Sequence, residues 1–145
     1  MRLALALLAV PLALAAGCGG SGPPTEPEEV VRAWSSAINE GDDARAASLF
    51  ARDAKVIQSG RTLRLRNAKV ARRWNSGLPC AGKIVETRVE GDEVTATFEL
   101  GERPGHDCDA PGVVAYALVQ VLDGKIVLWH QVDGPADEPA EGIEA

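Results

Sequence analysis

Positive charge is scarce in this sequence of 145 residues, which holds 15 Lys and Arg against 21 Asp and Glu and carries a formal net charge of −6. Proteins that bind nucleic acids neutralise the phosphate backbone mainly with Lys and Arg. The acidic balance therefore predicts that nucleic acid is not a partner of this chain.

Motifs that indicate a reaction are also scarce. The chain has two histidines, no Gly-rich phosphate loop, and no serine nucleophile in triad order with His and Asp. The run from His106 to Asp109 offers metal-ligand residue types, but it has no spaced second half and is interpreted as a surface turn. His130 alternates with Trp129 and Gln131, so we expect it to point away from them. No cofactor and no metal site are predicted, and the sequence leans against an enzyme.

Only one long apolar run is present, and it lies at the start of the chain. Arg2 precedes residues 3–16, which are apolar and too few to stay as a membrane-spanning helix. This pattern predicts a secretory signal peptide over residues 1–17. The ending LAAGC, which closes at Cys18, resembles the lipobox of bacterial lipoproteins. The resemblance implies that Cys18 is lipidated and that the protein is anchored in the cell envelope outside the cytoplasm. The alternative is an ordinary signal peptide cut near Ala16, which leaves a free thiol.

Cysteine is rare as well, with three residues in the chain. Once Cys18 is set aside, Cys80 and Cys108 remain. A pair of cysteines outside the cytoplasm normally oxidises, so we predict a disulfide between Cys80 and Cys108.

The two ends of the mature chain have compositions that cannot bury a core. Residues 18–25 join the lipidated cysteine to a Gly-, Ser- and Pro-rich tether, which we expect to be flexible. Residues 134–145 are acidic and contain proline, which is typical of a disordered tail. Residues 26–133 have a length that suits one domain.

The first half of this domain shows helical periodicity. Thr25 and Glu28 can form a capping box at the start of a helix, which Gly41 would end. Its apolar stripe comprises Val30, Val31, Trp34, Ala37 and Ile38. Asp42 can cap a second helix, with Ala46, Leu49 and Phe50 on its apolar side. Asn67 can cap a third helix, with Val70 and Trp74 on its apolar side and Gly77 at its end. Short strands are expected at residues 54–58 and 61–66.

After Cys80 the period changes to two, which predicts strands at residues 83–90, 93–100, 113–121 and 125–132. The inward face of the second of these strands would carry Val94, Ala96, Phe98 and Leu100. A three-residue turn at residues 122–124 would place Ala117 opposite Trp129, on the same face of the sheet.

Helices followed by antiparallel strands predict an α+β fold. The element order, with the closing run Asp-Gly-Lys-Ile-Val, resembles the nuclear transport factor 2-like superfamily and in particular its SnoaL-like members. The resemblance covers about residues 26–133 and is most specific at 30–56 and 122–129. It implies a cone-shaped, curved antiparallel sheet wrapped around the N-terminal helices, with a pocket at the open end.

The best-understood enzyme of this shape is ketosteroid isomerase, and the resemblance extends to the positions of its catalytic groups. Its carboxylate base falls on Gln58, and its oxyanion-hole tyrosine and aspartic acid fall on Trp34 and Ala117. A carboxamide cannot take a proton from carbon, and the other two residues do not reproduce the hydrogen-bond donors of that enzyme. Enolisation of this type is therefore rejected.

An apolar, largely aromatic pocket remains as the candidate site. Apolar walls with a few convergent polar groups are typical of small-molecule sites. The predicted ligand-binding residues are Trp34, Phe50, Gln58, Trp74, Ala117, Trp129 and Gln131. The alternative is that the rings fill the core completely and no ligand binds.

Two surfaces also stand out. The first is a basic cluster that could contact anionic lipid or form a solvated face paired with nearby Glu side chains, and it comprises Arg61, Arg64, Arg66, Lys69, Arg72 and Arg73. The second is an apolar strip on the outer sheet face, which predicts a homodimer or an element that covers the sheet, and it comprises Tyr116, Leu118, Ile126, Leu128 and Val132.

Three hypotheses for function follow. The first is a lipid-anchored envelope protein with a non-catalytic binding or accessory role and an apolar small-molecule pocket. The second is an enzyme that acts on a hydrophobic small molecule, with Gln58, Gln131 or Asp133 in polar roles. The third is a purely structural or protein-interaction domain.

Overall fold

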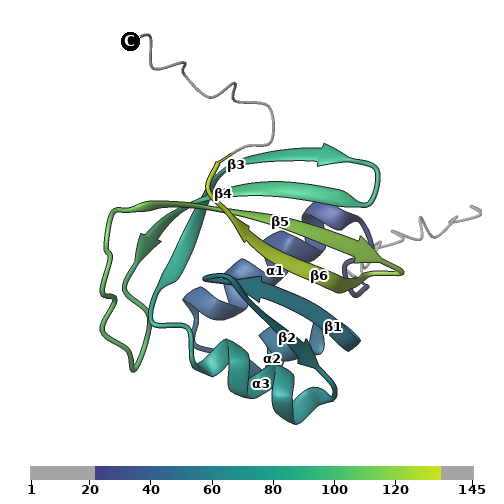
Figure 1. Cartoon of the computed structure of the whole chain (residues 1–145), viewed down its shortest axis with the longest axis horizontal. Coiled ribbons are helices and arrows are strands. Elements are labelled where there is room, and N and C mark those ends of the chain that lie inside the picture. Colours follow the sequence, from purple (N-terminus) through teal and green to yellow (C-terminus); the bar gives the residue numbers. More distant parts are fainter. Residues whose placement is uncertain (1–21, 135–145) are drawn as a thin grey trace, which may run out of the picture.

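A computed structural model describes residues 22–134 and shows a six-stranded, strongly curved sheet with helices in its concave side (Figure 1). This arrangement confirms the predicted α+β fold and its cone shape. The predicted signal peptide, Cys18 and residues 135–145 lie outside the described residues. No helix in the described part has the length and apolarity to cross a membrane. The elements are α1 (Pro27–Asn39), α2 (Asp43–Ser48), β1 (Phe50–Gln58), β2 (Arg61–Leu65), α3 (Ala68–Ser76), β3 (Ala81–Glu90), β4 (Glu93–Gly101), β5 (Val114–Leu122) and β6 (Lys125–Val132).

Helix α1 supplies the central layer of the core. Its predicted apolar stripe is confirmed, because all five of those side chains are buried. The predicted capping box of Thr25 and Glu28 was wrong. Pro27 is the first helical residue, and the cap residue Glu26 makes no side-chain hydrogen bond. Glu28 instead accepts hydrogen bonds from Arg32 (2.7 Å) and from the Thr87 hydroxyl (2.8 Å). These bonds, the one from Arg32 first, hold the pKa of Glu28 below its ordinary value.

The two shorter helices begin where their cap residues predict. Asp42 accepts a bond from the Arg45 backbone N–H, and Asn67 accepts one from the Val70 N–H. The second helix ends earlier than expected, however, because Phe50 is already the first residue of β1. The early part of β1 is irregular, with a register shift between Phe50 and Lys55. A bulge of this kind breaks the period of two, so the alternation could not reveal the start of the strand.

The sheet has the strand order β2-β1-β6-β5-β4-β3, in which β1 and β6 are parallel and all other neighbours are antiparallel. Register shifts interrupt the β1–β6, β3–β4 and β5–β6 pairs. Bulges bend and twist the strands that carry them. The sheet therefore curls around α1, which crosses its concave face (Figure 1).

The β5–β6 hairpin differs from its prediction. Its loop is the two-residue turn Asp123-Gly124, with φ angles of 50° and 71°. The shorter turn and a register shift between Gln120 and Val121 each move the pairing by one residue, so Ala117 pairs with Gln131 and not with its predicted partner Trp129. A shift of two residues leaves every side chain on its own face, so the inward position of Trp129 is confirmed.

A bulge in the same hairpin also changes the outer apolar strip. The register shifts between Gln120 and Val121, so Ile126 pairs with the buried Val121 and is 0% exposed in the core. Its predicted outward position was wrong. The other members of the strip are half-buried, and they are Tyr116, Leu118, Leu128 and Val132.

Candidate functional site

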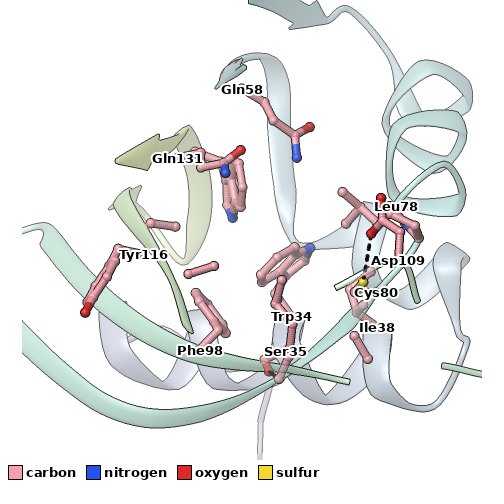
Figure 2. A pocket seen from close by; sticks show the side chains of 17 residues that line it. Trp34, Ser35, Ile38, Gln58, Leu78, Cys80, Phe98, Asp109, Tyr116 and Gln131 are labelled. Carbon is pink, nitrogen blue, oxygen red and sulfur yellow. Dashed lines mark hydrogen bonds between the residues drawn. The ribbon is translucent and has the colours of Figure 1, made fainter. Parts of the chain in front are cut away.

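A cavity of about 140 Å³ lies between α1 and the concave face of the sheet (Figure 2). Helix α1 contributes Trp34, because its apolar stripe faces the sheet. The strands contribute the residues that alternate inward, and the segment before β3 and the loop before β5 close the rim. The lining residues are Trp34, Ser35, Ile38, Gln58, Leu78, Pro79, Cys80, Ala81, Gly82, Phe98, Leu100, Asp109, Ala115, Tyr116, Ala117, Trp129 and Gln131.

Most of the predicted ligand-binding residues meet at this cavity. Five of them line it, namely Trp34, Gln58, Ala117, Trp129 and Gln131. The remaining two, Phe50 and Trp74, are not among the lining residues. They pack against each other with ring centroids 5.6 Å apart, and Trp74 stacks on Trp34 at 6.3 Å. Phe50 and Trp74 therefore support the aromatic wall without forming its surface.

The aromatic wall is a connected cluster of rings. Trp34 lies 5.9 Å from Trp129 and 6.1 Å from Phe98, and Trp74 lies 5.2 Å from Trp129 between ring centroids. Edge-to-face and offset pairs of this kind contribute about 0.5–1.5 kcal/mol each beyond their burial. The rings thus fix one another's orientation, and the wall is preformed.

Trp34 is held by a buried hydrogen bond in addition to its ring contacts. Its Nε1–H donates to Asn75 Oδ1 at 2.8 Å, and the Asn75 amide donates to the Ala71 carbonyl at 2.8 Å. Asn75 is fully buried, so the bond is shielded from water. Because this N–H already has a partner, Trp34 cannot offer it to a ligand.

Trp129 presents the opposite case. Its Nε1 is buried and has no hydrogen-bond partner among the described residues. A buried donor without a partner costs about 1–3 kcal/mol. Trp129 therefore lines the cavity while its own indole N–H stays without a hydrogen-bond acceptor.

The polar groups at the cavity are few. Gln58 and Gln131 supply neutral carboxamides, and within the described residues 22–134 the lining contains one carboxylate, the exposed Asp109, and no histidine. Asp133 is exposed and is not among the lining residues. His130 is also absent from the lining, as its alternation with Trp129 predicts. A set of this kind can orient a ligand, but it holds no group that is placed to move a proton within the aromatic wall.

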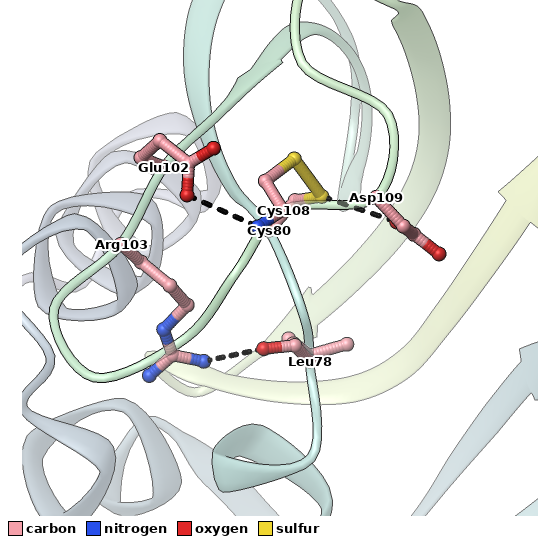
Figure 3. Close-up of a disulfide and its surroundings, with 6 residues drawn as sticks. All are labelled: Leu78, Cys80, Glu102, Arg103, Cys108 and Asp109. Carbon is pink, nitrogen blue, oxygen red and sulfur yellow. Dashed lines mark hydrogen bonds between the residues drawn. A yellow bond between two sulfur atoms is a disulfide. The ribbon is translucent and has the colours of Figure 1, made fainter.

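The predicted disulfide between Cys80 and Cys108 forms, with an S–S distance of 2.11 Å. Figure 3 shows this bond, and its Cys80 end borders the cavity. Asp109 Oδ1 is 3.5 Å from Cys80 Sγ, but a disulfide sulfur carries no proton, so this contact is no hydrogen bond. These three residues place their ligand atoms within 4.8 Å of one another, as a metal site would. Both sulfurs are oxidised, however, and neither can act as the thiolate ligand that such a site requires.

Arg103 ties the same loop to the helices, and sequence reasoning missed it. Its guanidinium donates to the carbonyls of Asn75 (2.9 Å) and Leu78 (3.1 Å) and forms an ion pair with Asp43 (2.5 Å; Figure 3 shows the Leu78 bond). The Arg103 side chain is 0% exposed. An arginine in a Gly- and Pro-rich loop was the one available signal, and it could not reveal the partners.

Among the lining residues that were not predicted for the site, Phe98 and Asp109 had a signal in the sequence. Phe98 belongs to the inward face of β4 that the alternation predicted, and it borders Trp34. Asp109 follows Cys108, so the predicted disulfide already brought it near Cys80. Tyr116 borders the cavity as well, with its ring turned away from Trp34 (Figure 2).

The size of the cavity limits what it can hold. A cavity of about 150 Å³ is enough for benzene, whereas pockets for drug-sized ligands measure about 300–1,000 Å³. At about 140 Å³, this cavity suits a molecule with roughly as many heavy atoms as benzene. A steroid-sized molecule would require the aromatic wall to move.

Comparison with known proteins places the fold among solved structures. A candidate polyketide cyclase from Sinorhizobium meliloti is 20% identical, with a TM-score of 0.60 over 72% of this chain and 94% of its own. A candidate ketosteroid isomerase from Kribbella flavida is 17% identical, with a TM-score of 0.61 over 81% of this chain and 84% of its own. A protein with a ketosteroid isomerase-like fold from Catenulispora acidiphila, in complex with trimethylamine, is 21% identical. Its TM-score is 0.58 over 74% of this chain and 86% of its own.

These identities show a shared fold and no more. No curated protein matches the chain. The model of one family does match, over residues 31–129. The chain therefore belongs to the SnoaL-like domain family.

Proposed function

We propose that this SnoaL-like domain is a non-catalytic receptor for a small, mostly apolar molecule. The observation that carries the proposal is the cavity of about 140 Å³, walled by the rings of Trp34, Phe98 and Trp129. Its connected rings give the ligand a preformed apolar surface, which reduces the entropy lost on binding.

The composition of the cavity supports binding over catalysis. The three positions that correspond to the catalytic groups of ketosteroid isomerase are Gln58, Trp34 and Ala117, and all three line the cavity. None of them is an acid or a base, and the Trp34 N–H is occupied by Asn75. We therefore do not propose for this chain the isomerase chemistry after which one of the similar structures is named.

The polar groups suggest what the ligand carries. The carboxamides of Gln58 and Gln131 can donate or accept, so the ligand needs no charge. Trimethylamine in the Catenulispora acidiphila protein is a molecule of comparably small size, which supports a small occupant for this fold.

A cavity-filling variant tests the proposal. Benzyl alcohol is a suitable probe, because it combines a benzene-sized ring with one hydroxyl, and progesterone serves as the oversized probe. We expect benzyl alcohol to change the tryptophan fluorescence saturably and progesterone to leave it unchanged. Ala115→Phe should abolish the response, since Ala115 lines the cavity. Val114→Phe is the matched control, because Val114 is exposed and is not among the lining residues. Equal responses in both variants would refute binding at this site.

One observation favours the second hypothesis, an enzyme acting on a hydrophobic small molecule. Asp109 is a carboxylate at the cavity rim, where it could act as a base. The test is to incubate a mixture of apolar metabolites with the protein and with Asp109→Asn, and to compare the products by mass spectrometry. A product formed by the unaltered protein alone would favour the enzyme over the receptor.

We also propose that the domain is held at the cell envelope by lipid on Cys18. The sequence ending in LAAGC supports this anchor. In a bacterial host, Cys18→Ser should move the protein from the membrane fraction to the soluble fraction and abolish incorporation of labelled palmitate. Labelling that persists in the variant would overturn the assignment of the anchor.

A further inference from the structure

Charge is distributed very unevenly along this acidic chain. Residues 54–85 contain eight of the 15 Lys and Arg and none of the 21 Asp and Glu, which leaves the rest of the chain with a formal charge of −14. Six of these cations lie on β2, α3 and the turn that joins them, and we call them the basic face. Its members are all exposed, and they are Arg61, Arg64, Arg66, Lys69, Arg72 and Arg73.

The cations of the basic face have no anionic partners within residues 22–134. Elsewhere in the described chain, Arg32 pairs with Glu28, and Arg45 pairs with Glu40. In this part of the chain, none of the six cationic side chains forms an ion pair or a hydrogen bond. The expected pairing with Glu side chains is therefore not found within residues 22–134, where the positive charge stays available to an external partner.

The arrangement of these cations works against folding. Arg64 is the direct cross-strand neighbour of Lys55 on β1, and like charges in that position are destabilising. Lys69 lies three and four residues from Arg72 and Arg73 on α3, where like charges also repel. The fold gains nothing from this clustering, which points to a role in recognition.

Leu63 is an apolar residue among the cations of β2, and its side chain lies on the same face of the strand as that of Arg61. Leu63 is 43% exposed. It lines a shallow groove with Val70, and Arg64 and Arg66 line the same groove. Cations around an inserted apolar side chain are the chemistry of proteins that lie on a membrane surface, whereas sequence-independent nucleic acid sites add aromatic rings for stacking. We propose that the basic face docks on an anionic lipid bilayer, with Leu63 entering the headgroup region.

This docking is independent of the pocket and of the lipid anchor. In Figure 1, β2 and α3 lie at the end of the molecule away from the β3–β4 hairpin. The chain outside residues 54–85 has a large negative charge, which an anionic bilayer repels. Attraction at one end and repulsion elsewhere would orient the domain on the membrane.

Vesicle binding tests the proposal in the Cys18→Ser chain, which removes any contribution from the anchor. We expect binding to vesicles of phosphatidylglycerol and phosphatidylcholine, no binding to pure phosphatidylcholine, and a loss of binding as salt is raised. Each cation near an anionic surface changes the affinity by roughly fivefold. The double variant Arg72→Gln/Arg73→Gln should therefore bind about 25-fold more weakly.

The matched control is Arg32→Gln/Arg45→Gln, which changes the net charge equally but removes cations outside the basic face. It should bind nearly as well as the parent chain. Leu63→Ser should weaken binding without changing its salt dependence. Equal binding to neutral and anionic vesicles, or equal loss in the two double variants, would overturn the proposal. Tighter binding to single-stranded DNA or to an acidic protein than to vesicles would also overturn it, by identifying another partner.

Discussion

Two polar side chains beside the pocket are buried and hydrogen-bonded, whereas the cations of the basic face are exposed and unpaired within the described residues. Around the pocket, Asn75 and Arg103 are buried, and each has partners that fix its position. On the basic face, Arg72 and Arg73 are exposed and have no partner within the described residues. The first region uses polar contacts to hold a rigid shape, whereas the second keeps charge that the fold does not use. The two regions should therefore respond differently to the loss of a side chain.

Removal of Arg103 should produce the largest effect on stability. Arg103→Met removes the guanidinium that donates to the Asp43 carboxylate and to the carbonyls of Asn75 and Leu78. We expect a loss of about 3–5 kcal/mol in the free energy of unfolding, as for other broken buried ion pairs. Urea denaturation measures this loss. The exposed pair of Arg45 with Glu40 is the control, and Arg45→Ala should cost at most about 1 kcal/mol. Similar losses in the two variants would contradict the structural role of Arg103.

The disulfide should rank next. Cys80 and Cys108 are 28 residues apart in the sequence, and closing such a loop stabilises the fold by about 3.5 kcal/mol in the chain-entropy model. The double variant Cys80→Ser/Cys108→Ser should lose about this amount. Because the disulfide lies at the cavity rim, the affinity for benzyl alcohol should fall as well. Denaturation with and without a reducing agent gives an independent measurement, and an unchanged midpoint after reduction would count against the prediction.

A pair of tryptophan variants compares two indoles within the pocket wall. Trp34→Phe removes the donor to the buried Asn75 Oδ1, whereas Trp129→Phe removes a donor that has no partner. Both changes shrink the ring by a similar volume, so the difference between them isolates the hydrogen bond. We expect Trp34→Phe to cost about 1–3 kcal/mol more than Trp129→Phe. Thermal unfolding measures the difference, and equal losses would mean that the Trp34 bond does not stabilise the wall.

The smallest effect on stability is expected for the basic face. Arg72→Gln/Arg73→Gln breaks no contact within the described residues, so the free energy of unfolding should change by no more than about 0.5 kcal/mol. Relief of like-charge repulsion could even stabilise the protein. A loss above 1 kcal/mol would show that these arginines serve the fold, and the contrast between the two regions would then fail.

Local rules were enough to predict much of the fold. The helical period identified the buried stripe that includes Val30 and Trp34, and the short polar caps Asp42 and Asn67 located the next two helices. The bulges could not be predicted, because no residue type in the sequence indicated where a strand holds an extra residue. For this reason the alternation assigned Ile126 to the outer face, although a register shift places it in the core.

The site was less predictable than the fold. The alternation placed Trp129 and Gln131 at the cavity, and the resemblance to ketosteroid isomerase placed Gln58 there. Helix α3 turns Ala71 and Asn75 into the core and leaves Trp74 half-buried, so Trp74 supports the wall from outside the lining. Arg103 and Asp109 belong to a loop without any period, and tertiary contacts alone determine where such residues lie.

The most direct test of a small preformed cavity is to record the indole N–H signals of the three tryptophans by NMR while benzyl alcohol or progesterone is added. We predict that benzyl alcohol shifts the Trp129 and Trp34 signals saturably and that progesterone does not. Equal shifts with progesterone, or no shift with either probe, would contradict a benzene-sized cavity bounded by these two rings.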